Sequence, residues 1–166
     1  MVLFIFLLTL GVGSVLSQCP EDFERHGTNC YKPMFIRTNW IEALRYCRTI
    51  GAYLITIKSA DEQRSVEGII ARYHGSFDIP RFWIAGGDMF SENEYHWYME
   101  AGNSEMITGY TNYDTNQPDN YRGHEHCLSI EFNGHTARWN DKNCNEVKYF
   151  LCQAKMETPS TVIGKK

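Results

Sequence analysis

The sequence lacks three features that would have pointed to particular partners or locations. It has no Asn-x-Ser/Thr pattern, so N-linked glycans are not expected. It has no run of about 20 apolar residues after the N-terminus, so no segment of the body is expected to span a membrane. The 166 residues include 16 Lys and Arg against 20 Asp and Glu, a net charge of -4. Neither nucleic acid nor an anionic membrane is therefore expected as the main partner.

Charged residues are also missing from the first 16 positions. The stretch Met1–Leu16 begins with apolar residues and continues with small ones. Val15 and Ser17 stand at the third and the first position before an expected signal-peptidase cut after Ser17. This pattern predicts a secretory signal peptide over residues 1–17. The tail, residues 155–166, is polar and lacks the hydrophobic segment of a lipid-anchor signal. We expect one secreted, extracellular domain over residues 18–154, with no membrane anchor.

Six cysteines follow the predicted cut: Cys19, Cys30, Cys47, Cys127, Cys144 and Cys152. No Cys-x-x-Cys pair is present, which argues against a zinc site built from cysteines. An even number in an oxidising compartment indicates three disulfides, although the spacing alone does not choose among the pairings.

The apolar pattern predicts two helices and several strands, an α+β protein. One helix is expected over Asn39–Ile50, capped by Thr38 and ended by Gly51, and another over Ala60–His74, after a capping box that starts at Ser59. The strand-like runs are Phe82–Ala85, Tyr95–Tyr98, Cys127–Phe132, Thr136–Trp139 and Tyr149–Gln153, with a short pair around Cys30–Phe35. The four tryptophans are expected in the core. Between Tyr98 and Cys127 the chain is polar, and an ordered, functional loop is expected there.

Motifs for catalysis are missing as well. The sequence has no His-Glu-x-x-His and no Gly-x-Ser-x-Gly pattern. His124 and His126 flank Glu125, but this spacing on a loop is weak support for a hydrolytic zinc site. No enzymatic activity is expected.

Five side chains, three late in the long loop and two directly after the strand-like run Thr136–Trp139, carry oxygen donors of mixed charge. They are two amides and three carboxylates: Gln117, Asp119, Glu125, Asn140 and Asp141. Ca²⁺ prefers such a set of hard oxygen ligands. The alternative is that these residues gather in loops only because they suit turns.

Four motifs, in order, resemble those of the C-type lectin domain in its long form. They are Phe82-Trp83-Ile84-Ala85-Gly86, Gln117-Pro118-Asp119, Glu125-His126-Cys127 and Trp139-Asn140-Asp141, and the resemblance covers Cys19 to about Ala154. It implies two helices, two small antiparallel sheets, a long calcium-binding loop and a cis bond before Pro118. It also implies the pairs Cys47–Cys152, Cys127–Cys144 and Cys19–Cys30, and the five oxygen-bearing residues above as ligands of one Ca²⁺.

The tripeptide Gln117-Pro118-Asp119 resembles that of family members that bind galactose or N-acetylgalactosamine. The order of amide and acid decides where a sugar hydroxyl can accept and donate around the ion. The same five ligands would therefore also bind the sugar. Tyr121 is a candidate platform for the apolar face of galactose; otherwise it is an exposed loop tyrosine.

The resemblance also suggests an auxiliary calcium site made by Asp88, Glu92, Asn120 and Glu125. Asn120 and His126 stand where the family usually has acids, so this site is expected to be weak. His124 and His126 are either ordinary polar loop residues or groups whose protonation weakens sugar binding at acidic pH.

Together these features predict a secreted, calcium-dependent, galactose-type carbohydrate-binding protein for recognition or agglutination of glycans, as in innate immunity. The alternative is a module of the same fold that binds a protein or mineral surface. Because one carbohydrate site binds weakly, we expect self-association or a multivalent target.

Overall fold

The computed structural model describes residues 17–78, 80–99 and 102–157. Residues 1–16 of the expected signal peptide and 158–166 of the tail lie outside this part. The elements, in chain order, are β1 (Glu24–His26), β2 (Asn29–Thr38), α1 (Trp40–Thr49), β3 (Tyr53–Leu54), α2 (Ala60–Arg72), η1 (His74–Ser76), β4 (Arg81–Gly87), β5 (His96–Tyr98), β6 (Ser104–Met106), η3 (Tyr121–Gly123), β7 (Cys127–Phe132), β8 (Ala137–Lys142) and β9 (Lys148–Lys155). Within the described residues, neither α-helix is long and apolar enough to cross a membrane.

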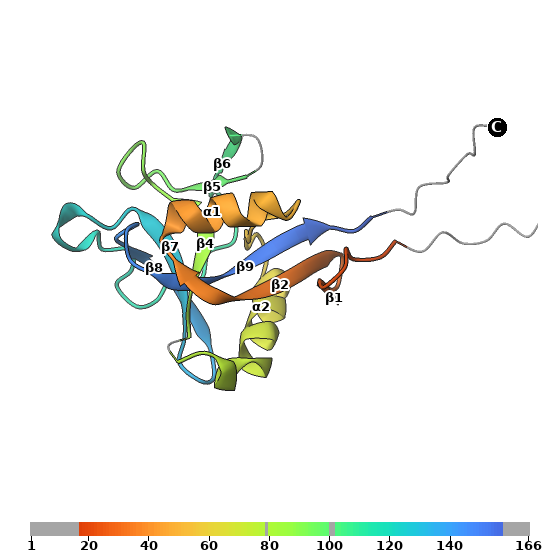
Figure 1. The fold of residues 1–166 in the computed structure, drawn as a ribbon. Coiled ribbons are helices and arrows are strands. Elements are labelled where there is room, and N and C mark those ends of the chain that lie inside the picture. Colours follow the sequence, from red (N-terminus) through yellow and green to blue (C-terminus); the bar gives the residue numbers. More distant parts are fainter. Residues whose placement is uncertain (1–16, 79, 100–101, 158–166) are drawn as a thin grey trace, which may run out of the picture.

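The strands form one mixed sheet in place of the two separate antiparallel sheets that were expected. The order β1-β2-β9-β4-β5-β6 forms the main path, β3 pairs with β9, and β7 joins β4 to β8. All pairs are antiparallel except β4 with β9, which run parallel where Phe82 lies opposite Tyr149. This pair connects the terminal half of the sheet with the half that carries the long loop (Figure 1).

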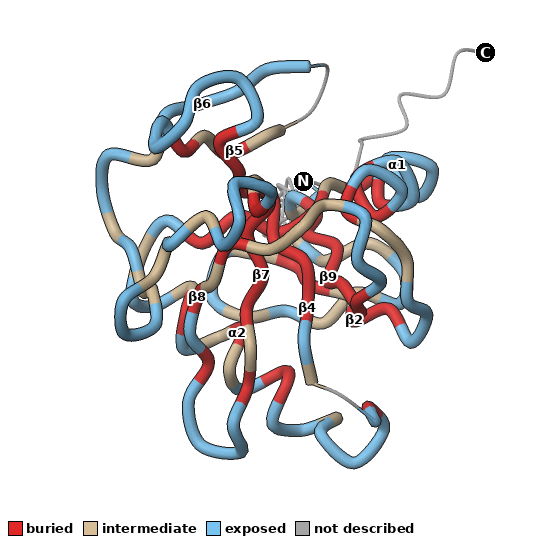
Figure 2. The backbone as a smooth tube through the Cα atoms, turned by 90° about the vertical axis from the view of Figure 1, so that its left-hand side faces the viewer, coloured by how far each residue is buried: buried red, intermediate tan, exposed pale blue. Residues whose placement is uncertain are grey.

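The central strands are buried along almost their whole length. In β4, every residue from Phe82 to Gly87 is buried, and in β9 burial runs from Lys148 to Ala154 (Figure 2). Near-continuous apolar runs are typical of strands covered on both faces. In Figure 1, α1 lies above β2 and β9, and α2 lies below them.

Both helices form where they were expected, with small shifts at the ends. Asn39, not Thr38, caps α1, because Thr38 is still the last residue of β2 and the Asn39 side chain accepts from the Glu42 amide at 3.0 Å. Gly51 follows α1 with a φ of 71°. Ser59 caps α2 through the Glu62 amide, and α2 ends at Arg72 because the chain tightens there into the short turn η1.

The strand limits also differ in detail. The run expected at Thr136–Trp139 is β8, which extends three residues further, and β3 and β6 are short strands that the pattern did not predict. At the other end, β9 continues to Lys155, and Glu157 forms a bridge with Gln18.

Three disulfides join the segments that the resemblance paired: Cys19–Cys30, Cys47–Cys152 and Cys127–Cys144. The second closes a separation of 105 residues and ties α1 to β9. A loop of that size is worth about 4 to 5 kcal/mol in the chain-entropy model. The third links the start of β7 to the turn after β8, next to the predicted ligands.

The four tryptophans lie in the core, as predicted, and are at most 2% exposed. Three of their indole N–H groups have partners: the Nε1 of Trp40 donates to the Ile84 carbonyl, that of Trp83 to the Thr38 carbonyl, and that of Trp139 to Gln63 Oε1. Burial of an indole without such a partner would be costly.

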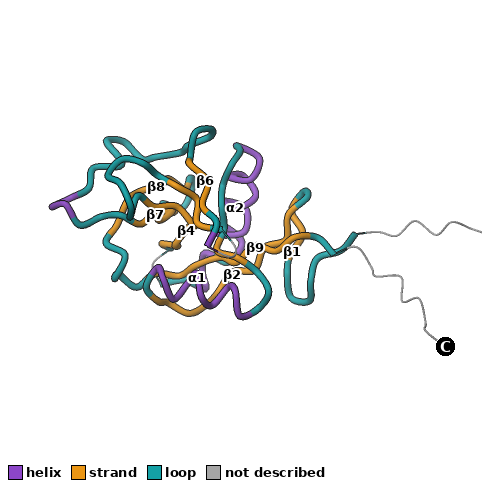
Figure 3. Tube along the Cα trace, turned by 90° about the horizontal axis from the view of Figure 1, so that it is seen from above, coloured by secondary structure: helices purple, strands orange, loops and turns teal. Residues whose placement is uncertain are grey.

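Trp139 also holds the long loop against the sheet. Its ring contacts Trp97, Tyr110 and Tyr113 edge-on. Its backbone amide donates to the Asn112 carbonyl, and its carbonyl accepts from the Asp114 amide. The loop therefore runs directly beside β8 at this point. In Figure 3, η3 lies at the end of the described structure that is opposite β1.

Gly87, the last residue of β4, approaches the backbone of the loop closely. A Cβ added there would lie 2.5 Å from the His126 carbonyl oxygen. We expect Gly87→Ala to reduce the free energy of unfolding by about 1 to 3 kcal/mol, because a backbone atom would have to move. Urea denaturation with the disulfides intact measures this effect.

The control is Gly68→Ala in the middle of α2, where nothing lies within 4 Å of the added Cβ. That change is expected to stabilise the protein by about 0.5 to 1 kcal/mol. Equal denaturation midpoints for the Gly87 variant and the unchanged protein would show that the close approach imposes no constraint.

Candidate functional site

The predicted ligands come from two segments that the fold brings together. Gln117 and Asp119 lie in the long loop, Glu125 lies where the loop returns to β7, and Asn140 and Asp141 belong to β8. The antiparallel pairing of β7 with β8 places Leu128 opposite Asp141. The loop then has to fold back over this strand pair for its own side chains to reach the same place.

Backbone conformation makes that return possible. The peptide bond between Gln117 and Pro118 is cis. Asn116, Asn120, Arg122 and Gly123 all have φ between 42° and 72°. Asn and Gly enter this left-handed region more readily than other residues, which is why they suit a tightly folded loop.

The carboxylate of Asp141 fixes the position of the loop. Asp141 is fully buried. Its Oδ1 accepts from the Asp119 amide at 3.1 Å, and its Oδ2 accepts from the Asn120 amide at 2.7 Å and from the Tyr95 hydroxyl at 3.4 Å. Each carboxylate oxygen has two lone-pair directions, so Asp141 can hold the loop and still offer an oxygen to a cation.

Three other predicted ligands present buried oxygens that have no hydrogen-bond partner. These atoms are Gln117 Oε1, Glu125 Oε2 and Asn140 Oδ1. Buried acceptors are almost always paired, and an unpaired one costs free energy. Three such acceptors among the predicted ligands fit a site that is completed by a cation that takes oxygen ligands, such as Ca²⁺.

The charges of the site lead to the same conclusion. One carboxylate oxygen from each of Asp119, Glu125 and Asp141 can be chosen so that all lie within 4.8 Å of one another. Burial raises the pKa of Glu125, while Lys142, whose Nζ lies 3.4 Å from Glu125 Oε1, acts in the opposite direction. Three carboxylates this close repel one another unless a cation lies between them.

Two residues of the site were missed by reasoning from the sequence. Tyr95 was expected only as the first residue of a strand, yet its hydroxyl donates to Asp141 and its ring packs on Tyr113. Burial and the Asp141 charge raise the pKa of the Tyr95 hydroxyl, so it remains a donor. Lys142 follows the Trp-Asn-Asp motif directly, and no pattern distinguishes it from other lysines of a strand end.

Tyr121 lies in η3 at the rim of the loop and is 58% exposed. The Arg122 guanidinium lies 5.1 Å from its ring centre. Its ring is accessible to a ligand, unlike the core tryptophans. His124 is also exposed.

The residues expected at an auxiliary calcium site divide between two places. Asp88, Glu92 and His126 form a second group whose ligand atoms lie within 4.8 Å of one another. Asn120 joins this group through a hydrogen bond to Glu92. The Glu125 carboxylate belongs instead to the group that contains Asp119 and Asp141.

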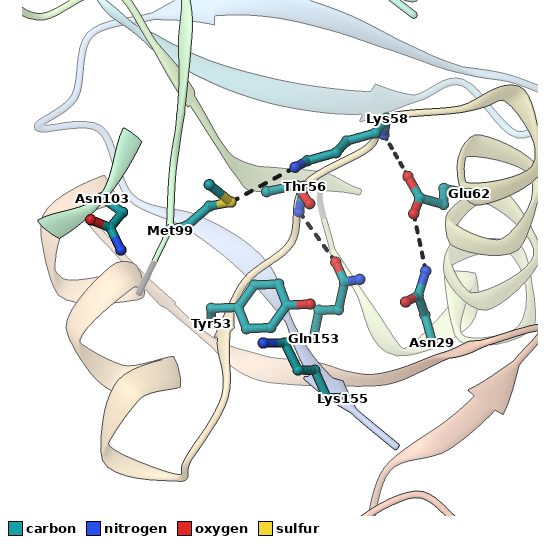
Figure 4. Close-up of a pocket in the computed structure, with 9 residues that line it drawn as sticks. All are labelled: Asn29, Tyr53, Thr56, Lys58, Glu62, Met99, Asn103, Gln153 and Lys155. Atoms are coloured by element: carbon teal, nitrogen blue, oxygen red, sulfur yellow. Dashed lines mark hydrogen bonds between the residues drawn. The ribbon is translucent and has the colours of Figure 1, made fainter. Parts of the chain in front are cut away.

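A cleft of about 400 Å³ elsewhere in the molecule includes none of the predicted ligands. It lies between β2, β9 and the start of α2, and its wall includes Lys58, Glu62 and Gln153 (Figure 4). Glu62 accepts from Asn29 and from the Lys58 amide, and the Lys58 ammonium pairs with Glu105. Glu62 and Lys58 thus already have partners, in contrast to the unpartnered oxygens of Gln117, Glu125 and Asn140.

Comparisons with known proteins agree with this architecture. The family model "Lectin C-type domain" matches residues 36–154. The chain is 31% identical over 135 residues to perlucin of Haliotis laevigata, covering 81% of this chain and 82% of that protein. It is 30% identical over 155 residues to the C-type lectin BJcuL of Bothrops jararacussu, covering 92% and 91%.

Among solved structures, the carbohydrate-recognition domain of the mouse scavenger receptor C-type lectin superposes with a TM-score of 0.69 at 26% identity, over 84% of this chain and all of the other. The chain therefore belongs to the C-type lectin domain family. Members of this family are, in general, binding proteins without catalytic activity.

The role of Asp141 in holding the loop gives a prediction about stability. Asp141→Ala would leave the amides of Asp119 and Asn120 without an acceptor, so we expect a loss of about 2 kcal/mol. Asp119→Ala, which removes an exposed carboxylate without removing its amide, is expected to change stability by less than about 0.5 kcal/mol. Urea denaturation in excess chelator compares the two, and equal midpoints would contradict the role given to Asp141.

Proposed function

We propose that this protein is a secreted, calcium-dependent carbohydrate-binding protein with a preference for galactose and N-acetylgalactosamine. The observation that carries the proposal is that three of the predicted ligands, Gln117, Glu125 and Asn140, have a buried oxygen without a hydrogen-bond partner, and that the carboxylates of Glu125 and Asp141 approach within 4.8 Å of each other. Asp119 adds a third carboxylate at the open side of this group. A Ca²⁺ held by these five residues would still accept two more oxygens, which the neighbouring hydroxyls of a sugar can supply.

The sugar preference rests on the order of Gln117 and Asp119 around Pro118. A sugar hydroxyl that binds the ion must also donate to a carboxylate and accept from an amide. Exchanging the acid and the amide exchanges these roles around the ion. The exposed ring of Tyr121 supports the same preference, because galactose has an apolar face that can stack on an aromatic ring.

Secretion is proposed from the apolar N-terminus together with the disulfides. Three disulfides are typical of proteins from oxidising compartments. A single exposed sugar site gives weak binding, so we propose that the protein acts through several sites, by self-association or on a multivalent glycan surface. Recognition or agglutination of glycans, including those of microbes in innate immunity, is the role that suits such binding.

Isothermal titration with galactose and with mannose, each in calcium and in excess chelator, tests the proposal directly. We expect galactose to bind in calcium and its binding to disappear on chelation. Calcium at about 100 times its dissociation constant should also raise the free energy of unfolding by about 2.7 kcal/mol. Asp119→Ala should abolish both effects, while Asp61→Ala, an exposed acid at the start of α2, should leave them unchanged.

The titration also separates the proposal from the alternative. Calcium binding without binding of either sugar would mean that the site serves a protein or mineral surface instead. Galactose binding that survives chelation would show that the ion does not bridge the sugar.

The preference is tested by Gln117→Glu combined with Asp119→Asn. The double variant keeps the number of carboxylates, so its calcium affinity should be retained while donor and acceptor positions are exchanged. We expect galactose affinity to fall roughly tenfold or more and mannose binding to appear. Competitive elution from immobilised galactose and mannose measures both, and an unchanged galactose preference would refute this account of selectivity.

A further inference from the structure

Beside the proposed calcium site lies a second polar cluster that this site does not use. It consists of Asp88, directly after β4, Glu92 in the following turn, and Asn120 and His126 from the long loop. We refer to these four residues as the latch. They stand at positions where the resemblance implies an auxiliary calcium site, so the first question is whether they fit a calcium ion.

Each oxygen of the Asp88 carboxylate already accepts one hydrogen bond. Asp88 is 2% exposed. Its Oδ1 lies 3.1 Å from His126 Nδ1, and its Oδ2 accepts from the Asn93 amide at 2.9 Å. Because a carboxylate only accepts, the imidazole must carry its hydrogen on Nδ1 and donate it to Asp88.

The Asn120 side chain of the latch makes two hydrogen bonds, one as a donor and one as an acceptor. Its Nδ2 donates to Glu92 Oε2 at 2.6 Å, and its Oδ1 accepts from the Glu125 amide at 3.0 Å. The Asn120 side chain thus joins the turn after β4 to the place where the loop returns to β7. An aspartate at this position could accept from Glu125 but could not donate to Glu92.

The two clusters therefore differ in whether their acceptor oxygens have hydrogen-bond partners. Among the proposed calcium ligands, three buried oxygens have no partner. In the latch, both oxygens of Asp88, the Oδ1 of Asn120 and one oxygen of Glu92 are already occupied by donors. Ca²⁺ needs six to eight oxygen ligands, and the latch offers an imidazole nitrogen and an amide nitrogen in their place. The residues present do not fit an auxiliary calcium ion.

We propose that the latch replaces the second calcium ion and holds the long loop in its binding conformation before any cation arrives. His126 and Asn120 each donate an N–H group to one of the two carboxylates. The positive end of each N–H dipole takes the place of the positive charge that an ion would otherwise provide. The loop would then be closed in calcium-free protein, and each chain would bind one Ca²⁺. The count of one ion rests on the proposed function; the closed loop does not.

The latch also reaches the proposed calcium site through the backbone. The Asn120 amide donates to Asp141 Oδ2 at 2.7 Å, so fixing the Asn120 side chain also fixes this contact. Ordering a loop on binding costs affinity, and a loop that is already ordered avoids this cost. Asn120 and His126 thus act as positioning residues for a site whose ligands lie on the adjacent residues Asp119 and Glu125.

The first experiment counts calcium ions by titration and by metal analysis after dialysis. The unchanged protein should bind one Ca²⁺ per chain, and added Zn²⁺ should not bind at the latch. Asn120→Asp with His126→Asp should restore oxygen ligands and bind two. The matched control is Asn103→Asp with His135→Asp, which adds the same charges at exposed positions outside both clusters and should still bind one.

The second experiment measures amide hydrogen exchange of the loop in excess chelator. The amides of Asn120 and Glu125 should remain protected in the unchanged protein. In Asn120→Ala with His126→Ala their protection should fall by about tenfold or more, while the core strands keep theirs. The same double variant should bind calcium about tenfold more weakly, since two charge-assisted hydrogen bonds are lost.

The outcomes separate this proposal from the proposed function. Two Ca²⁺ in the unchanged protein, a Zn²⁺ that is lost on His126→Ala, or loop amides that exchange freely in chelator would each overturn the latch. Protected loop amides without any calcium binding would support the latch and overturn the proposed function. One Ca²⁺ together with protected amides in chelator would support both.

Discussion

The buried carboxylate of Asp141 is the constraint on which the loop and its site depend. It lies on β8, the strand whose Trp139 holds the start of the loop, and it accepts the amides of Asp119 and Asn120. A charge without exposure to water has to be satisfied by fixed donors or by a cation. The loop supplies two of those donors through its backbone, so its conformation is tied to the charge that the proposed calcium ion would bind.

Neighbouring residues of the loop divide between two electrostatic tasks. Asp119 and Glu125 belong to the carboxylate group around Asp141, whereas Asn120 and His126, each one position further along, bond to Glu92 and Asp88. The cluster around Asp141 has buried acceptors without a hydrogen-bond partner, whereas the acceptors of the other cluster have donors. The proposal of a single calcium ion rests on this difference between the two groups of acids.

Local patterns predicted most of the fold because helices and central strands depend on nearby sequence. The buried stripes gave both helices, and the apolar run at Cys127–Phe132 gave β7 with its observed limits. The ends were less predictable. Thr38 was replaced as a cap by Asn39 because the pairing of β2 with β9 extends to Thr38, which is a long-range contact. The parallel pairing of β4 with β9, which merges the two expected sheets, is likewise invisible to local pattern.

The sequence by itself determined the kinds of ligand atoms, the cysteines available for crosslinking and the family to which their order belongs, because these depend on residue type and spacing. Only the tertiary structure decided which oxygens remain unpaired, that Tyr95 and Lys142 contact the site, and that Asn120 and His126 occupy the acceptors of Glu92 and Asp88. The physical reason is that hydrogen bonds and burial depend on which distant segments the fold brings together. The residue type determines which atoms can donate or accept a hydrogen bond, whereas the tertiary structure determines whether those atoms already have a partner.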